Sequence, residues 1–309
     1  MRKKVPGHNR SEAVAVKQPY CTFLAAMKQR WQSDDTVKSA CFSFGHLDAF
    51  LEAESKAFSD ITDDDLNRFR RLLTEHGLAV LSVDLIFRYV RQLFRWLTRT
   101  GRIFLDPAAD WVIPIPDRPL LDAPTEEQMV ALLRQPDVST PLGVRDRAFI
   151  EVAYSTGARR AELAGLKIHD LNLNDGLLRL MGKGRKERMV PLGREGVQWL
   201  QTYLTDIRPR LAALGRPDED RLWLGHEGKP IQEVGLRMMV RVRSIRAGLK
   251  PVSLHSLRRA CATHMLRNGA HPVQIQTLLG HADLTSLSQY LRLTIRDIRK
   301  MHASSKVGR

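Results

Sequence analysis

Cysteine is scarce in this 309-residue sequence, and no apolar run approaches the length of a membrane span. The three cysteines, Cys21, Cys41 and Cys261, are odd in number and far apart, which argues against a disulfide framework or a metal cluster and fits a reducing compartment. The basic start, MRKK, has no apolar segment behind it, so a secretory signal is not expected. Internal repeats and low-complexity tracts are also missing. The sequence therefore predicts a cytoplasmic protein with no membrane partner.

Acidic residues are outnumbered by basic ones. The 49 lysines and arginines face 34 aspartates and glutamates, which gives a formal net charge of +15. An excess of this size indicates a polyanionic partner, most simply nucleic acid, although a basic face that meets only solvent is the alternative. Hydrophobic residues make up 43% of the chain, enough for the cores of two domains of ordinary size.

Helical periodicity dominates the first third of the chain. Residues 1–18 are predicted to be a basic arm, and residues 19–109 a helical domain with helices over about 36–54, 62–77 and 82–100. The third helix carries arginines opposite its apolar stripe. These are Arg88, Arg91, Arg95 and Arg99. Because this row has one sign only, it is predicted to contact DNA phosphates, with a solvated face as the alternative.

Four prolines without periodicity mark residues 110–124 as a linker. Residues 125–290 are predicted to be a second domain, which opens at a Thr125/Gln128 capping box. The period then changes, so that 177–181 and 187–192 are expected to be strands of a hairpin whose tip is Gly182-Lys183-Gly184. Helices are expected on either side of it, over 125–134, 144–154, 159–166, 195–211, 231–247 and in the stretch from 253 onward, with a turn at 155–157. The predicted fold is mainly α, with a mixed α/β second domain that contains a small antiparallel sheet.

Six residues of the second domain suit chemistry at a phosphate. They are Arg159, Lys183, His255, Arg258, His281 and Tyr290. Each alone is ordinary: an HxxR pair is often a surface ion pair, and a lone tyrosine is often a core residue. Together they supply cations for non-bridging phosphate oxygens, a tyrosine nucleophile, an imidazole to take its proton, and Lys183 to protonate a leaving alkoxide. Arg160 competes with its neighbour for the first arginine position. Glu162, on the next turn, is placed to hold an arginine, with a solvated carboxylate as the alternative.

No metal or other cofactor is expected. The six residues include no group of carboxylates, and cationic side chains can supply the charge that a divalent ion would otherwise provide. A zinc site of His255, His264, His271 and His281 is the alternative. An arginine would share that pocket, and no cysteine or carboxylate completes the ligand shell, so zinc is not favoured.

The order and spacing of these motifs resemble the tyrosine recombinase (lambda-integrase-like) family, most closely its Xer-type and its integron or transposon members. The motifs are TGARRAEL, GKGRKERMVPL, HSLRRACATHMLRNG, LLGHADL and the tyrosine at 290. The resemblance covers residues 125–301 by motif. Residues 20–115 match the family's core-binding domain only in length and helical character. The chain departs from the family pattern at Ala158, where leucine is commoner, and at Arg259, where many relatives have histidine.

The resemblance implies roles for all six residues. Arg159 and Arg258 would grip the scissile phosphate, His281 would hydrogen-bond it, and His255 would be the acid/base near the nucleophile. Tyr290 would attack to leave a 3′-phosphotyrosyl link, and Lys183 would protonate the 5′-oxygen. Because the link stores the bond energy, ATP would not be needed.

The resemblance also implies the partners. A homo-tetramer would exchange strands between two double-stranded DNA sites through a Holliday junction, each site specific and arranged as an inverted repeat. A second recombinase or an accessory protein could take part. The tail, 291–309, would dock on a neighbouring protomer, with docking on its own domain as the alternative. Two other functions stay open: DNA relaxation like that of a type IB topoisomerase, and DNA binding by a non-catalytic regulator.

Overall fold

The computed structural model describes residues 20–30, 34–111, 123–182 and 187–280. The basic arm, the hairpin tip with Lys183, and the segment that holds His281, Tyr290 and the tail lie outside these residues. The chain divides into two compact units, Met1–Pro119 and Leu120–Arg309. The division falls within the range predicted as a linker, and each unit is described by itself.

The first unit is a helical bundle. Its helices are α1 (Tyr20–Gln29), α2 (Asp34–Ala53), α3 (Asp63–Glu75) and α4 (Val80–Arg99), with a 3₁₀ turn at Phe58–Asp60. Three of the four helices match the predicted ones to within about two residues at most ends, and α1 adds a further helix. Aromatic side chains fill the centre, including Phe44, Phe69 and Phe87, each with no exposed surface. A capping box fixes the start of α3, where the Asp65 carboxylate accepts hydrogen bonds from the backbone N–H and the hydroxyl of Thr62.

Trp111 belongs to this unit's core, although the sequence analysis placed it in the linker. It is 6% exposed, and its indole stacks on Phe87 with ring centroids 3.9 Å apart. The indole N–H donates to Oδ1 of Asn67 at 3.0 Å. A buried tryptophan needs such a partner, and here it ties the end of the unit to α3.

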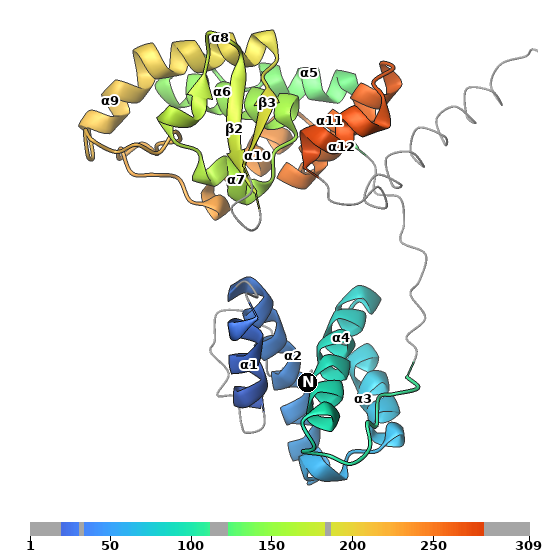
Figure 1. The fold of residues 1–309 in the computed structure, drawn as a ribbon. Helices are drawn as coiled ribbons and strands as arrows, with labels where there is room; N and C mark the ends of the chain where they lie inside the picture. Colours follow the sequence, from blue (N-terminus) through green and yellow to red (C-terminus); the bar gives the residue numbers. More distant parts are fainter. Residues whose placement is uncertain (1–19, 31–33, 112–122, 183–186, 281–309) are drawn as a thin grey trace, which may run out of the picture. The chain divides into compact units, whose positions relative to one another are not determined.

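The second unit combines helices with one small sheet (Figure 1). Its helices are α5 (Glu126–Arg134), α6 (Pro141–Thr156), α7 (Arg160–Gly165), α8 (Arg194–Thr202), α9 (Arg208–Ala213), α10 (Glu233–Arg246), α11 (Leu254–Arg267) and α12 (Pro272–Leu279). The strands are β1 (Leu171–Asn172), β2 (Leu177–Met181) and β3 (Glu187–Pro191), antiparallel and in that order. The predicted capping box is confirmed, because the Thr125 hydroxyl accepts from Gln128 N and the Gln128 side chain accepts from Thr125 N.

Two local predictions for this unit were incomplete. The helix expected over 195–211 is α8, a π-helical turn at Tyr203–Ile207, and α9. Pro209, in the first turn of α9, has no N–H to continue the preceding helix. Strand β1 was not predicted, because two residues are too few to show a period.

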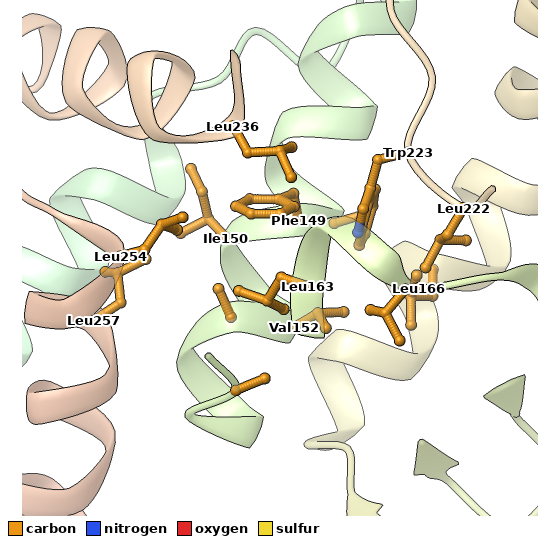
Figure 2. Packing of buried hydrophobic residues seen from close by; sticks show 14 of the residues in the cluster. Phe149, Ile150, Val152, Leu163, Leu166, Leu222, Trp223, Leu236, Leu254 and Leu257 are labelled. Atoms are coloured by element: carbon orange, nitrogen blue, oxygen red, sulfur yellow. The ribbon is translucent and has the colours of Figure 1, made fainter. Parts of the chain in front are cut away.

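Helix α6 lies at the centre of the second unit, with α8, α11 and β3 packed around it. The ring of Phe149 on α6 packs edge-on against that of Trp223. Leu163 of α7, Leu236 of α10 and Leu257 of α11 belong to the same buried cluster (Figure 2). Helices α11 and α12 share a smaller cluster of Ala262, Ile275 and Leu279. This packing brings the end of α6, the start of α7 and the end of α12 to one place. None of the helices in the described ranges is long and apolar enough to cross a bilayer.

Candidate active site

Arg159 stands at the junction between α6 and α7. Helix α6 ends at Gly157, whose φ of 57° lies in the left-handed region. A Cβ at this position would come within 2.6 Å of the Leu279 side chain, so the close approach of α12 also requires glycine. Arg159 is then the N-cap of α7, and its side chain is 41% exposed. The turn thus places a partly exposed guanidinium at a helix N-terminus.

Glu162 holds Arg159, as the sequence analysis proposed. Its carboxylate accepts from the backbone N–H of Arg159 at 2.7 Å and from Nη1 of the same residue at 3.0 Å. The Glu162 side chain is only 3% exposed. Burial alone would raise the pKa of this carboxyl group, but hydrogen bonds from Arg188 and Arg159 outweigh burial and keep the pKa below its usual value. Glu162 is therefore an ionised, buried support for the arginine.

Arg258 is 3% exposed and reaches two helix ends from α11. Its Nη1 donates to the carbonyl oxygen of Gly157 at 2.6 Å, and its Nη2 donates to that of Leu279 at 2.8 Å. Both acceptors lie at the C-terminal ends of helices, where carbonyl groups lack partners within the helix and the dipole favours a cation. Arg258 therefore ties α6 and α12 together at the place where Arg159 emerges.

The end of α12 receives three arginines. Nε of Arg188 donates to the Leu278 carbonyl at 3.1 Å, Arg258 to that of Leu279, and Nη2 of Arg159 to that of Gly280 at 2.8 Å. Gly280 ends the helix in the left-handed conformation, with φ 62°. Three consecutive carbonyls are thus each bound by a different guanidinium, so positive charge is concentrated where the chain continues to His281.

His255 lies one helical turn before Arg258 on α11. Ser253 caps this helix, its hydroxyl accepting from Ser256 N at 3.0 Å. His255 is exposed at the surface. Neighbouring protein atoms still displace part of the water around its ring, and this desolvation, together with the charges of Arg259 and Arg258, keeps the pKa of His255 below the usual histidine value. A neutral imidazole at neutral pH can accept a proton, which suits the predicted acid/base role.

Arg160, the competing candidate, points elsewhere. It forms an ion pair with Glu233 of α10, and its side chain is 53% exposed. Of the two adjacent arginines, only Arg159 joins the group with Arg258 and Glu162. The hairpin lysine, His281 and Tyr290 lie outside the described residues, so their places remain predictions.

Two histidines of the zinc alternative, His264 and His271, have other partners. Nδ1 of His264 lies 2.7 Å from the Tyr154 hydroxyl, in the interior. His271 caps α12, and its Nδ1 accepts from Val273 N at 3.3 Å. Within the ranges that the structure describes, no three His, Cys, Asp or Glu side chains are grouped as metal ligands.

Two residues of this region were given no place in the predicted site. Arg188, on β3, contacts Glu162 as well as α12. The sequence signal that could have identified Arg188 is the alternation of the strand, in which Arg188 points inward between the exposed residues Glu187 and Met189. Arg259, noted only as a departure from the family pattern, is 7% exposed and donates to Ser256 Oγ at 3.2 Å. Strand alternation indicates that Arg188 points inward, but which groups these two arginines contact is a tertiary feature that sequence spacing does not identify.

The arginine row of the first unit is less uniform than predicted. Arg88 forms an ion pair with Asp84, a buried carboxylate four residues earlier on α4. Arg95 and Arg99 are exposed and Arg91 is partly exposed, and no ion pair joins these three to another described residue. Three of the four arginines therefore keep a charge that is available to a phosphate.

Comparison with known proteins shows the family to which this chain belongs. Residues 124–296 match the family described as the phage integrase family. Tyrosine recombinase XerD of Pseudomonas putida is 34% identical over 283 residues, which cover 91% of this chain and 94% of that protein. Tyrosine recombinase XerD of Shewanella oneidensis is 31% identical over 271 residues, 87% of this chain and 90% of its own.

Solved structures show the same fold. A lambda integrase dimer (residues 75–356) bound to a COC′ core site aligns with a TM-score of 0.71 at 19% identity, covering 88% of this chain and 93% of that one. The XerA recombinase aligns at 26% identity with a TM-score of 0.52, covering 92% and 98%. The chain therefore belongs to the phage integrase family and is a tyrosine recombinase, an enzyme of site-specific DNA strand cleavage and rejoining.

Proposed function

We propose that this protein recombines specific double-stranded DNA sites through a 3′-phosphotyrosyl intermediate, without metal or ATP. The observation that carries this proposal is the convergence of Arg159 and Arg258 on the end of α12. His255 lies one helical turn before Arg258 on α11. The carbonyls that these guanidinium groups now bind are oxygen acceptors, as are the non-bridging oxygens of a phosphodiester. Arg159, which is 41% exposed, is open to such a group.

The two arginines would bind the scissile phosphate and stabilise the charge that grows on its oxygens as the phosphorus becomes pentacoordinate. The guanidinium fork fits two oxygens at once, which also fixes the phosphate in orientation. Each preorganised donor is worth roughly 3–4 kcal/mol in comparable oxyanion sites. Glu162 already orders Arg159, so little rearrangement is needed when DNA binds.

Tyr290 would attack the phosphorus and Lys183 would protonate the departing 5′-oxygen. A phenol of pKa about 10 is mostly protonated at neutral pH, so a base must take its proton. His255 suits this step because its lowered pKa leaves the ring neutral. His281 would add a hydrogen bond to the phosphate. The phosphotyrosyl bond keeps the energy of the broken diester, and the 5′-hydroxyl of a partner strand can reverse the step.

Recombination requires two sites, so we propose a homo-tetramer that exchanges strands through a Holliday junction. The lambda integrase neighbour is a dimer on a core site, and XerH was solved on a palindromic difH substrate, which supports an inverted-repeat target. Each unit would clamp the duplex, the first through Arg91, Arg95 and Arg99. A second recombinase or an accessory protein can join this assembly. The curated relatives come from bacteria, which favours action on DNA in a bacterial cytoplasm.

The proposal is tested by trapping the covalent intermediate. The purified protein is incubated with fragmented DNA from its native locus in excess EDTA, quenched with detergent, and the DNA that remains bound is sequenced. We expect wild type to give adducts at one sequence, and Tyr290→Phe to bind that sequence without an adduct. Adducts of wild-type yield from Tyr290→Phe would refute the proposal, as would a strict need for added metal. Joining of two separate sites distinguishes a recombinase from a topoisomerase, and any adduct excludes a non-catalytic regulator.

A further inference from the structure

Arg188 contacts both halves of the candidate site. It lies on β3, and its side chain is 15% exposed. Nη1 and Nη2 donate to the two carboxylate oxygens of Glu162 at 2.7 and 2.9 Å, and Nε donates to the Leu278 carbonyl at 3.1 Å. One guanidinium is thus shared between the residue that holds Arg159 and the last turn of α12.

The charge balance at Glu162 depends on this contact. The buried carboxylate is bound by two cations, bidentately by Arg188 and through Nη1 by Arg159. The three side chains together carry one net positive charge, which is available to a phosphate. Without Arg188, a 3% exposed carboxylate would face Arg159 as its one remaining cation among the described residues. It would then bind Arg159 more fully and cancel its charge.

The contact with α12 is equally close. A Cβ on Gly280 would lie 3.0 Å from Nε of Arg188, so the guanidinium packs directly against this glycine. The chain runs on from Gly280 to His281, and later to Tyr290. The strand that carries Arg188 also begins just after the segment that contains Lys183. Arg188 therefore joins, through contacts and chain connectivity, the segments that supply most of the predicted machinery.

We propose that Arg188 is a positioning residue for strand cleavage. It neutralises and orients Glu162 so that Arg159 can present its guanidinium to the scissile phosphate, and it fixes the turn of α12 that leads to His281. It does not touch the reacting atoms. This inference rests on the proposed function, since it concerns the same phosphate.

The test uses the full-length protein and a matched control. Arg188→Met removes the charge but keeps an unbranched side chain, and Arg188→Lys keeps the charge but loses the fork. Arg179→Met is the control: Arg179 lies on the adjacent strand β2 and is also paired with carboxylates, those of Asp170 and Glu187, but it does not contact Glu162. The probe is a duplex with the sequence recovered by adduct trapping and a nick beside the cleavage position. Cleavage of this duplex is irreversible, because the short fragment that it releases is lost.

Two quantities are measured for each variant: the dissociation constant for the duplex, and the single-turnover rate of adduct formation at saturating DNA. We expect Arg188→Met to bind DNA nearly as wild type does but to form adducts about 10²-fold more slowly, as for a misplaced catalytic group. The rate of adduct formation by Arg188→Lys should lie between those of Arg188→Met and wild type, and the rate of Arg179→Met should match wild type. A role in overall folding alone would instead lower the active fraction and leave the rate of the folded molecules unchanged. A wild-type rate in folded Arg188→Met or Arg188→Lys would overturn the proposal.

A double substitution tests the charge relationship itself. If Arg188 acts by neutralising Glu162, then Arg188→Met combined with Glu162→Gln should cleave faster than Arg188→Met alone, because no buried carboxylate remains to capture Arg159. If the rate defect of the double variant equals the product of the defects of the two single variants, Arg188 and Glu162 are not coupled and the idea is refuted. If Arg188→Met does not fold by circular dichroism, the Arg188→Lys rate decides. Absence of adducts with wild type would refute the proposed function instead.

Discussion

Arg159 and Arg258 donate to consecutive backbone carbonyls, those of Gly280 and Leu279, and the nitrogen–oxygen distance is 2.8 Å in both hydrogen bonds. The first arginine comes from the start of α7 and the second from α11, so the pair exists only because α12 ends between them. The three Arg-bound carbonyls form the negative end of a helix dipole, which stabilises the cations before DNA arrives. Binding of a phosphate would exchange one set of oxygen acceptors for another.

Arg159 and Arg160 allow the first prediction, because they are adjacent and differ in what they contact. Arg159→Ala should lower the single-turnover rate of adduct formation by about 10²–10³-fold, the effect of losing one preorganised oxyanion donor. Arg160→Ala breaks only an exposed pair with Glu233 and should change the cleavage step little. Quench-flow on the nicked duplex measures both rates. A larger defect in Arg160→Ala than in Arg159→Ala would reverse the assignment.

The second prediction concerns Lys183 as the acid for the leaving 5′-oxygen. Lys183→Ala should cleave normal DNA slowly, because an alkoxide leaves poorly without a proton. A substrate with sulfur at the 5′-bridging position has a good leaving group and should restore most of the rate. The ratio of the two rates is compared between variant and wild type. Equal defects on both substrates would take Lys183 out of this role.

The third prediction concerns DNA binding by the first unit. Arg91→Ala together with Arg95→Ala should flatten the dependence of log affinity on log salt by about two units, since each lost phosphate contact removes about 0.9. Arg88→Ala should have a smaller effect, because Asp84 already neutralises that guanidinium. Fluorescence anisotropy across a salt series gives the slopes. If the double variant keeps the wild-type slope, the arginine row faces only solvent.

The fourth prediction concerns acid stability. Burial keeps the pKa of His264 below its usual value of about 6.5, although the Glu126 carboxylate opposes this. The unfolded state therefore binds more protons than the folded state just below that pH, so the free energy of unfolding should fall as the pH drops through about 6.5. Urea denaturation at several pH values measures this slope. His264→Gln, whose amide can still accept from Tyr154, should have a shallower slope, and unchanged slopes would contradict the prediction.

The fifth prediction concerns the tail, which we propose docks on a neighbouring protomer. Residues 291–301 are too few to form a stable helix alone, so their apolar side chains need a docking surface. A head-to-tail contact of this kind can close a ring of protomers. Truncation after Thr294 should leave binding to one site nearly intact while pairing of two sites and strand exchange are lost. Normal recombination by the truncated protein in a two-site assay would show that the tail does not link protomers.

Sequence alone determined the features that depend on neighbouring residues. The capping boxes at Thr62 and Thr125, the Ser253 cap, and the hairpin strands at 177–181 and 187–191 all follow from hydrogen bonds or side-chain periods within a few positions. The motifs that reveal the family are equally short, and so Arg159 and Arg258 were predicted as site residues without coordinates.

Only the tertiary structure decided how distant residues meet. Trp111 joins a core because Phe87 and Asn67 offer it a stacking face and an acceptor, and neither is near it in sequence. Arg188 became visible as a support for the site only when β3 packed beside Glu162 and the end of α12. No local pattern shows that a buried carboxylate lies opposite a given arginine, because that depends on which faces of the elements are buried together. Packing, rather than spacing, gathers these charges at one helix end.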